Sequence, residues 1–115
     1  MYYSVSIHHP APGKRDELIA SMHRYGAAIT GAPGLVSVNT LHDAGQDVLM
    51  GLAIWESEEA FQTSVHLARE AVAADPFDEW EAEPVVGFRL TEVYSARLRG
   101  RSSTVLRRTS GVAGL

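Results

Sequence analysis

The sequence predicts an α+β domain in which two helices cover one face of a four-stranded antiparallel sheet. Three observations predict it. Apolar residues recur every second residue in four segments and with helical spacing in two others. These segments follow one another in the order β-α-β-β-α-β, which is a split βαβ arrangement. The chain has 115 residues, enough for one domain and too few for two.

The first half of the chain predicts a strand followed by a helix. Residues Tyr2 to His8 alternate in polarity, and Tyr3, Val5 and Ile7 share one face. Prolines and a glycine in residues 9–13 end this strand. From Lys14 a helical pattern runs to the glycines and proline of residues 31–34, with an apolar stripe formed by Leu18, Met22, Tyr25 and Ile29.

The second half predicts a hairpin, a helix and a last strand. Leu35–His42 and Val48–Trp55 form the hairpin around a turn at residues 43–46. Ser57 suits the N-cap of a helix over Ala60–Ala74, whose apolar face is Phe61, Val65, Ala68 and Val72. A short turn follows, and Val85–Tyr94 is the fourth strand. This order is the ferredoxin-like topology, with the first and third strands central and the domain spanning residues 1–94.

The third strand is apolar on both faces, and this predicts a homodimer. An open antiparallel sheet normally alternates between apolar and polar residues, yet Val48–Trp55 contains no charged residue at all. The two helices cover only one face of the sheet. We therefore expect a homodimer in which this face packs against the same face of a second copy and the two sheets form a closed or nearly closed β-barrel.

The charges divide the chain into an acidic domain and a basic tail. Residues 1–96 carry five Lys and Arg against fourteen Asp and Glu, whereas residues 97–115 carry five arginines and no acid. An acidic domain argues against a nucleic-acid partner. Residues 95–115 are expected to be flexible or to dock on the acidic surface of the partner subunit. The chain has no cysteine and no apolar run long enough for a membrane span, so we expect a cytoplasmic protein without membrane contact.

Three sequence blocks stand out along the chain: Pro12-Gly13-Lys14, Ala32-Pro33-Gly34-Leu35, and Trp55-Glu56-Ser57-Glu58-Glu59-Ala60-Phe61. In this order and spacing they resemble the antibiotic biosynthesis monooxygenase family, which belongs to the dimeric α+β barrel superfamily. The resemblance covers residues 1 to about 93 and excludes the tail. It implies the fold, the homodimer and a pocket between sheet and helices that binds a small aromatic or hydrophobic ligand.

The resemblance implies a cofactor-independent monooxygenase that oxidises a small aromatic or quinol-type substrate. A non-catalytic dimeric barrel that binds a hydrophobic ligand is the alternative. A haem-degrading enzyme is a further alternative, but the family's haem-binding positions are occupied here by Ala73, Ser64 and a serine of the first strand. His66 would then have to bind haem from a shifted position. A flavin supplied by a partner reductase also remains open.

Six residues are candidates for the site. His66, at the edge of the apolar face of the second helix, and Arg89, the only cation in the fourth strand, are the candidate catalytic residues. Trp55, Trp80, Phe77 and Asn39 are the candidate substrate-binding residues. Trp55 also suits a structural anchor, and Arg89 also suits an ion pair with Glu92 or Glu56.

No residue pattern in the sequence indicates a metal site. The adjacent His8 and His9 point to opposite sides of a strand, and no second ligand pair supports them. With His23 and His42 they are expected at the surface. We therefore expect neither a metal nor a bound cofactor.

Overall fold

The computed structural model describes residues 1–96 and contains one four-stranded antiparallel sheet. Its strands are β1 (Tyr2–His8), β2 (Leu35–Asp43), β3 (Val48–Trp55) and β4 (Val86–Thr91), in the order β2-β3-β1-β4. The predicted topology, with the first and third strands in the middle, is confirmed. The tail from Arg97 onward lies outside the described residues, and the predictions made for it therefore stay predictions.

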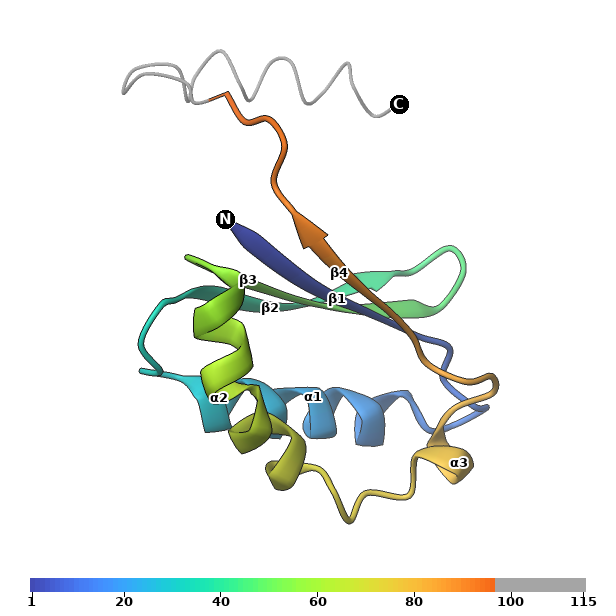
Figure 1. Cartoon of the computed structure of the whole chain (residues 1–115). Coiled ribbons are helices and arrows are strands. Elements are labelled where there is room, and N and C mark those ends of the chain that lie inside the picture. The colour runs from blue at the N-terminus through green and yellow to red at the C-terminus, as the bar shows by residue number, and fades with distance from the viewer. Residues whose placement is uncertain (97–115) are drawn as a thin grey trace.

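Helices α1 (Arg15–Ile29) and α2 (Glu58–Ala71) lie on the same side of the sheet, as predicted, and a short helix α3 (Phe77–Trp80) follows them (Figure 1). Ser57 caps α2 as expected, because its hydroxyl accepts a hydrogen bond from the Ala60 amide at 3.1 Å. Gly34 lets the α1–β2 connection pass close to the start of α2. A Cβ at this position would lie 2.5 Å from the Ala60 Cβ, and the backbone φ is +85°.

Two elements end three residues earlier than predicted, and the other predicted boundaries differ by at most two residues. Helix α2 begins at Glu58 and ends at Ala71, three residues earlier than predicted, because residues 72–75 form a turn closed by the Asp75 amide on the Val72 carbonyl. Strand β4 ends at Thr91 instead of Tyr94 because β1, its neighbour in the sheet, begins at Tyr2 opposite Thr91. Beyond that pair a backbone hydrogen bond still runs from the Glu92 amide to the Met1 carbonyl.

The core lies at the end of the molecule where α2 crosses β1 and β3. Trp55 and Phe61 pack edge to face with ring centroids 6.1 Å apart, and Tyr2 packs on Phe61 at 5.3 Å. Trp55 is 1% exposed. Its main role is therefore that of a structural anchor between β3 and α2.

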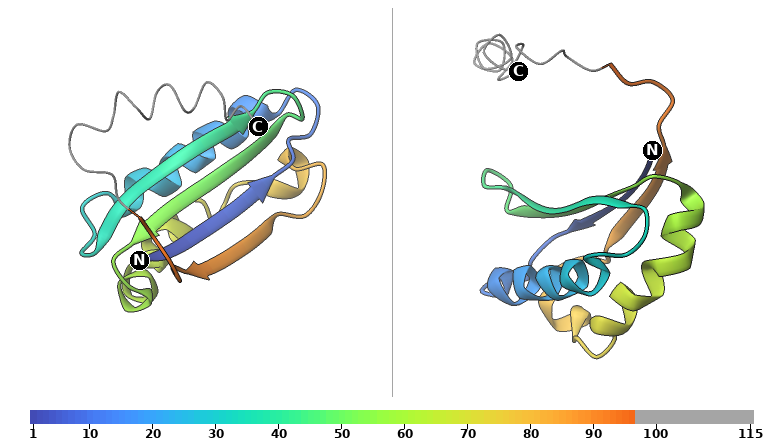
Figure 2. Two further views of the ribbon diagram at one scale, coloured as in Figure 1. Left: turned by 90° about the horizontal axis from the view of Figure 1, so that it is seen from above. Right: turned by 90° about the vertical axis from the view of Figure 1, so that its left-hand side faces the viewer.

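Among residues 1–96, the helices of the domain lie on one side of the sheet and no element covers the other side (Figure 2). This uncovered side is largely apolar. The strand registers place eleven apolar side chains there: Tyr3, Val5, Ile7, Leu41, Val48, Met50, Leu52, Ile54, Val86, Phe88 and Leu90. Leu41, Val86, Phe88 and Leu90 are each 44–48% exposed. The opposite side of β1, which faces the helices, carries Ser4, Ser6 and His8. Within residues 1–96, no helix is both long and apolar enough to cross a membrane.

Candidate functional site

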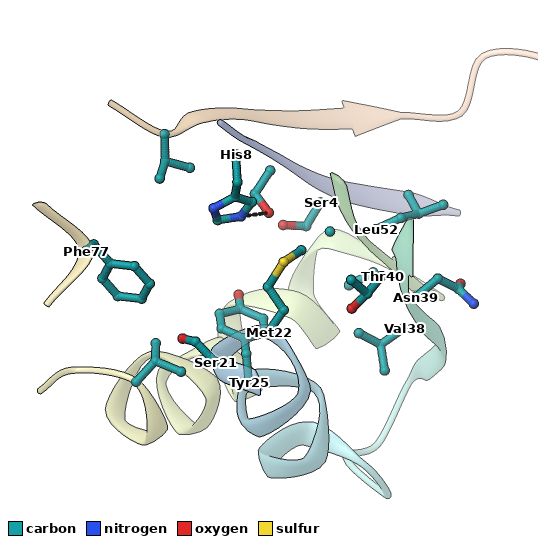
Figure 3. Close-up of a pocket in the computed structure, with 15 residues that line it drawn as sticks. Ser4, His8, Ser21, Met22, Tyr25, Val38, Asn39, Thr40, Leu52 and Phe77 are labelled. Carbon is teal, nitrogen blue, oxygen red and sulfur yellow. Dashed lines mark hydrogen bonds between the residues drawn. The ribbon is translucent and has the colours of Figure 1, made fainter. Parts of the chain in front are cut away.

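A cavity of about 270 Å³ lies between the sheet and α1 (Figure 3). Its walls are mostly apolar, and its polar groups come mainly from β1 and α1. The side chains of Val38 and Thr40 point into it from β2, Phe77 lies at its end, and Val85 also lines it. The other lining residues are Ser4, Ser6, His8, Ser21, Met22, Tyr25, Asn39, Gly51, Leu52, Ala53 and Val72.

Two glycines keep the middle of the sheet free of side chains on the cavity side. Ser6 of β1 pairs with Gly51 of β3 on one side and with Gly87 of β4 on the other. A Cβ at Gly51 would lie 2.7 Å from the Ser6 Oγ and 3.3 Å from the Met22 Cε. The space above Ser6 therefore exists because the position opposite it on β3 is glycine.

A histidine and a glutamate form a buried hydrogen-bonded pair beside the cavity. His8 Nδ1 lies 2.5 Å from Glu81 Oε2, and the two side chains are 10% and 4% exposed. His8 Nε2 lies 2.9 Å from the Ser6 Oγ. With Glu81 as a carboxylate and His8 as a neutral imidazole, Nδ1 donates to Glu81 and Nε2 accepts from the Ser6 hydroxyl. Glu81 thereby fixes the ring, and the second ring nitrogen, Nε2, lies beside the cavity.

Backbone pairing holds Glu81 next to β1. Pro10 and Glu81 form an isolated antiparallel bridge, flanked by hydrogen bonds from Ala11 to Trp80 and from Ala82 to His9 of 2.8 and 2.7 Å. The second carboxylate oxygen of Glu81 accepts from the His9 amide at 3.2 Å. The glutamate is therefore held at both oxygens.

A second opening adjoins the cavity between β1, β4 and α2. The cavity and this opening share Ser4, Ser6, Tyr25 and Val85, so the two lie next to each other. Arg69 of α2 and Arg89 of β4 line the opening, and the Arg89 guanidinium lies 5.1 Å from the ring centroid of Phe61. Burial raises the pKa of Tyr25, and the positive charges of Arg69 and Arg89 oppose part of that rise.

The structure does not bring the six candidate residues together in one site. Phe77 and Asn39 both line the cavity, although the Asn39 side chain points away from it (Figure 3). Arg89 lines the second opening. Trp55 lies in the core, and Trp80 packs edge to face on Phe77 with centroids 6.1 Å apart. His66 lies on the exposed side of α2, and neither the cavity nor the second opening includes it.

Two further expectations need correction. Arg89 forms no ion pair within residues 1–96, because Glu92 accepts the Tyr3 hydroxyl at 2.6 Å and Arg89 lies over Phe61. His8 was expected at the surface but is 8% exposed. Its position on the Ser4–Ser6 face of β1 was the available signal, whereas nothing in the sequence pointed to Glu81 as its partner. No group of three or more metal-ligating side chains gathers anywhere in the described part of the chain.

Comparisons with known proteins show the fold. No protein-family model matches the sequence, and no curated protein sequence matches it either. Among solved structures, Rv0793 from Mycobacterium tuberculosis has a TM-score of 0.71 at 17% identity, covering 84% of this chain and 98% of that chain. SnoaB, a cofactor-independent oxygenase from Streptomyces nogalater, has a TM-score of 0.68 at 15% identity, covering 82% and 94%.

A third similar structure is a candidate antibiotic biosynthesis monooxygenase from Nitrosomonas europaea. Its TM-score is 0.63 at 16% identity, and the match covers 82% of this chain and all of the other. The α+β fold that the sequence resemblance implied is therefore confirmed. At these identities the likeness concerns the fold, and the chemistry has to be argued from the cavity itself.

Proposed function

We propose that this protein is a cofactor-independent monooxygenase that oxidises a small phenolic aromatic or quinol-type substrate in the cavity between the sheet and α1. The observation that carries the proposal is the buried His8–Glu81 pair beside a mostly apolar cavity. The fold supports it, because one similar structure is that of a cofactor-independent oxygenase. In such chemistry the substrate supplies the electrons, and the protein supplies a base and a dry, shaped cavity.

The first step is removal of the phenolic proton of the substrate. His8 Nε2 is the acceptor, since Glu81 occupies Nδ1 and fixes the orientation of the ring. The Ser6 hydroxyl, 2.9 Å from Nε2, lies where a substrate hydroxyl can replace it or bind through it. The negative charge of Glu81 stabilises the positive ring that forms when His8 takes the proton.

The second step is the reaction of the phenolate with molecular oxygen. One electron passes from the phenolate to O₂, and the two radicals join to form a carbon–oxygen bond at a ring carbon that carries two hydrogens in the keto form. The protonated His8 returns its proton to the peroxide. Loss of the carbon-bound proton and cleavage of the O–O bond then release water and leave a carbonyl. Overall, a CH₂ group and O₂ become C=O and H₂O, so atoms and electrons balance.

The apolar side chains of the cavity position the substrate ring. Phe77 and Met22 supply flat or adaptable apolar surface, and the glycine pair beside Ser6 leaves room for a planar molecule on the sheet. Removal of bulk water strengthens each polar interaction inside the cavity. These apolar side chains therefore orient the substrate ring, and His8 transfers the proton.

We also propose that the uncovered apolar side of the sheet packs on the same side of a second copy. Its strand residues are almost all uncharged, with Asp43 at the edge as the exception, so the surface is complementary to itself and offers little to a charged partner. A two-fold dimer would bury the side chains that are now 44–48% exposed.

Oxygen uptake with a panel of anthrones, hydroquinones and quinols tests the activity. We expect turnover of at least one compound, and we expect His8→Gln and Glu81→Gln each to lower kcat by roughly 10²-fold or more, the usual contribution of a positioned base. His23→Gln, which changes an exposed histidine of α1, is the matched control and should retain full activity. Saturable binding without any turnover would instead favour the non-catalytic, ligand-binding barrel.

A further inference from the structure

Within residues 1–96, some Lys and Arg side chains form ion pairs with acidic residues and others do not. Residues 1–96 contain five Lys and Arg among fourteen Asp and Glu. Three of the five cations form ion pairs: Lys14 with Glu17, Arg15 with Asp47 and Arg24 with Asp75. Arg69 and Arg89 form none within these residues, although acids outnumber cations almost three to one.

Both unpaired arginines line the same opening. Arg69 comes from α2 and Arg89 from β4, and the opening that they line adjoins the cavity, with Tyr25 lining both. Residues 97–115 contain no Asp or Glu side chain, so the rest of the chain has no acidic side chain to offer them. Two cations without counter-ions within residues 1–96, at an opening beside a mostly apolar cavity, are suited to an anionic group of a ligand.

We propose that Arg69 and Arg89 form a carboxylate-binding subsite, so that the substrate is an aromatic acid whose carboxylate lies at this opening. The inference builds on the proposed function, because it specifies the substrate class of the same cavity. A guanidinium presents parallel N–H donors that match the two oxygens of a carboxylate. The contact of Arg89 with the Phe61 ring at 5.1 Å holds the guanidinium in place before the ligand arrives.

The positions along β1 define the shape of the ligand. Arg89 lies opposite Ser4 in the sheet, four residues along the strand from His8. Four strand residues span roughly 13 Å between Cα atoms. A ligand whose hydroxyl meets His8 and whose carboxylate meets Arg89 therefore needs the two groups at opposite ends of a fused, two-ring system. A single ring with adjacent hydroxyl and carboxylate groups is too short.

Isothermal titration calorimetry with two matched ligands tests the subsite. A hydroxynaphthoic acid, with its hydroxyl and carboxylate at opposite ends, is compared with the corresponding neutral amide. We expect the native protein to bind the acid about 10- to 100-fold more tightly, the range for hydrogen bonds to a charged group. Equal affinity for both ligands, or no measurable binding of the acid, would overturn the proposal.

Substitutions assign the preference to the two arginines. Arg69→Gln and Arg89→Gln should each weaken binding of the acid by about tenfold and leave binding of the amide unchanged, because only the acid meets the positive charge. Arg15→Gln, which removes an arginine paired with Asp47, is the matched control and should leave both affinities unchanged. A double variant at Arg69 and Arg89 that still prefers the acid would also overturn the proposal.

The same experiment separates the subsite from the activity. Binding is measured without oxygen and repeated in His8→Gln, where the preference for the acid should persist because the arginines are intact. A preference for the acid without oxidation of any compound would refute the monooxygenase proposal and support the subsite. Oxidation of the acid and the amide with equal kcat/KM would support the monooxygenase and refute the subsite.

Discussion

Replacing Phe88 by alanine should weaken self-association strongly, because this ring projects from the uncovered side of the sheet. Phe88 is 46% exposed in the single chain. A phenylalanine side chain offers about 200 Å², so about 90 Å² remains for burial by a second copy. At about 25 cal/mol per Å² this area contributes about 2 kcal/mol. A two-fold interface contains the ring twice, so the loss is about 4 kcal/mol, or roughly 10³-fold in the dimer Kd.

Sedimentation velocity over a range of concentrations measures this loss. Leu67→Ala is the control, because Leu67 is 42% exposed on α2, away from the uncovered side of the sheet, and loses a similar kind of apolar surface. We expect the control to associate like the native chain. If Phe88→Ala also retained the native Kd, or if the native chain were monomeric at every concentration, the assignment of this face to a second copy would be refuted.

Three other outcomes are expected. Gly51→Ala should weaken binding of aromatic ligands at least tenfold by calorimetry, because its methyl group would lie 2.7 Å from the Ser6 Oγ; unchanged binding would show that this space is not used. The hydrogen bond from the Ser21 hydroxyl, and to a smaller extent the Arg24 guanidinium, hold the pKa of Asp75 below its ordinary 3.8. The ionised Asp75 therefore contributes stability that is present above pH 3.8 and is lost as the pH falls through the lowered pKa. Between about pH 5 and about pH 2 the Tm of the Ser21→Ala variant should therefore fall by less than the Tm of the native protein. Thermal unfolding at several pH values measures this, and an equal fall in both proteins would contradict it. His66→Gln should keep native oxygen uptake, since His66 lies outside the cavity, and a large loss would restore the role predicted from the sequence.

The fold was predictable because its signals are local. The alternation in Tyr2–His8 and the helical stripe from Leu18 to Ile29 depend on neighbouring residues only. Ser57 likewise indicated where α2 starts, because it is the N-cap of the helix that begins at Glu58. The early end of α2 was not predictable, because it depends on a turn whose carboxylate, Asp75, is bound by Ser21 from a distant helix.

The site was harder to predict because it depends on long-range pairing. His8 and Glu81 are 73 residues apart in sequence and meet only through the bridge between Pro10 and Glu81. The alternation of β1 separated Ser4, Ser6 and His8 from the apolar residues, but it did not show which side faces the helices. The usual assumption that the apolar side faces the core is reversed in this strand, since its polar side lines the cavity. His66 was favoured because it lies beside an apolar helical stripe, yet the turn of α2 directs it to the surface.

The segment that lines one end of the cavity also carries the partner of the proposed base, His8. Phe77 and Val85 line the cavity, and Glu81 lies between them in the chain. If this segment moves outward to admit a ligand, the carboxylate moves away from the His8 ring at the same time. The cavity would then be open at this end only while Glu81 does not hold the His8 ring. Proton removal would thus be confined to the closed state, in which the bound substrate is already shielded from water.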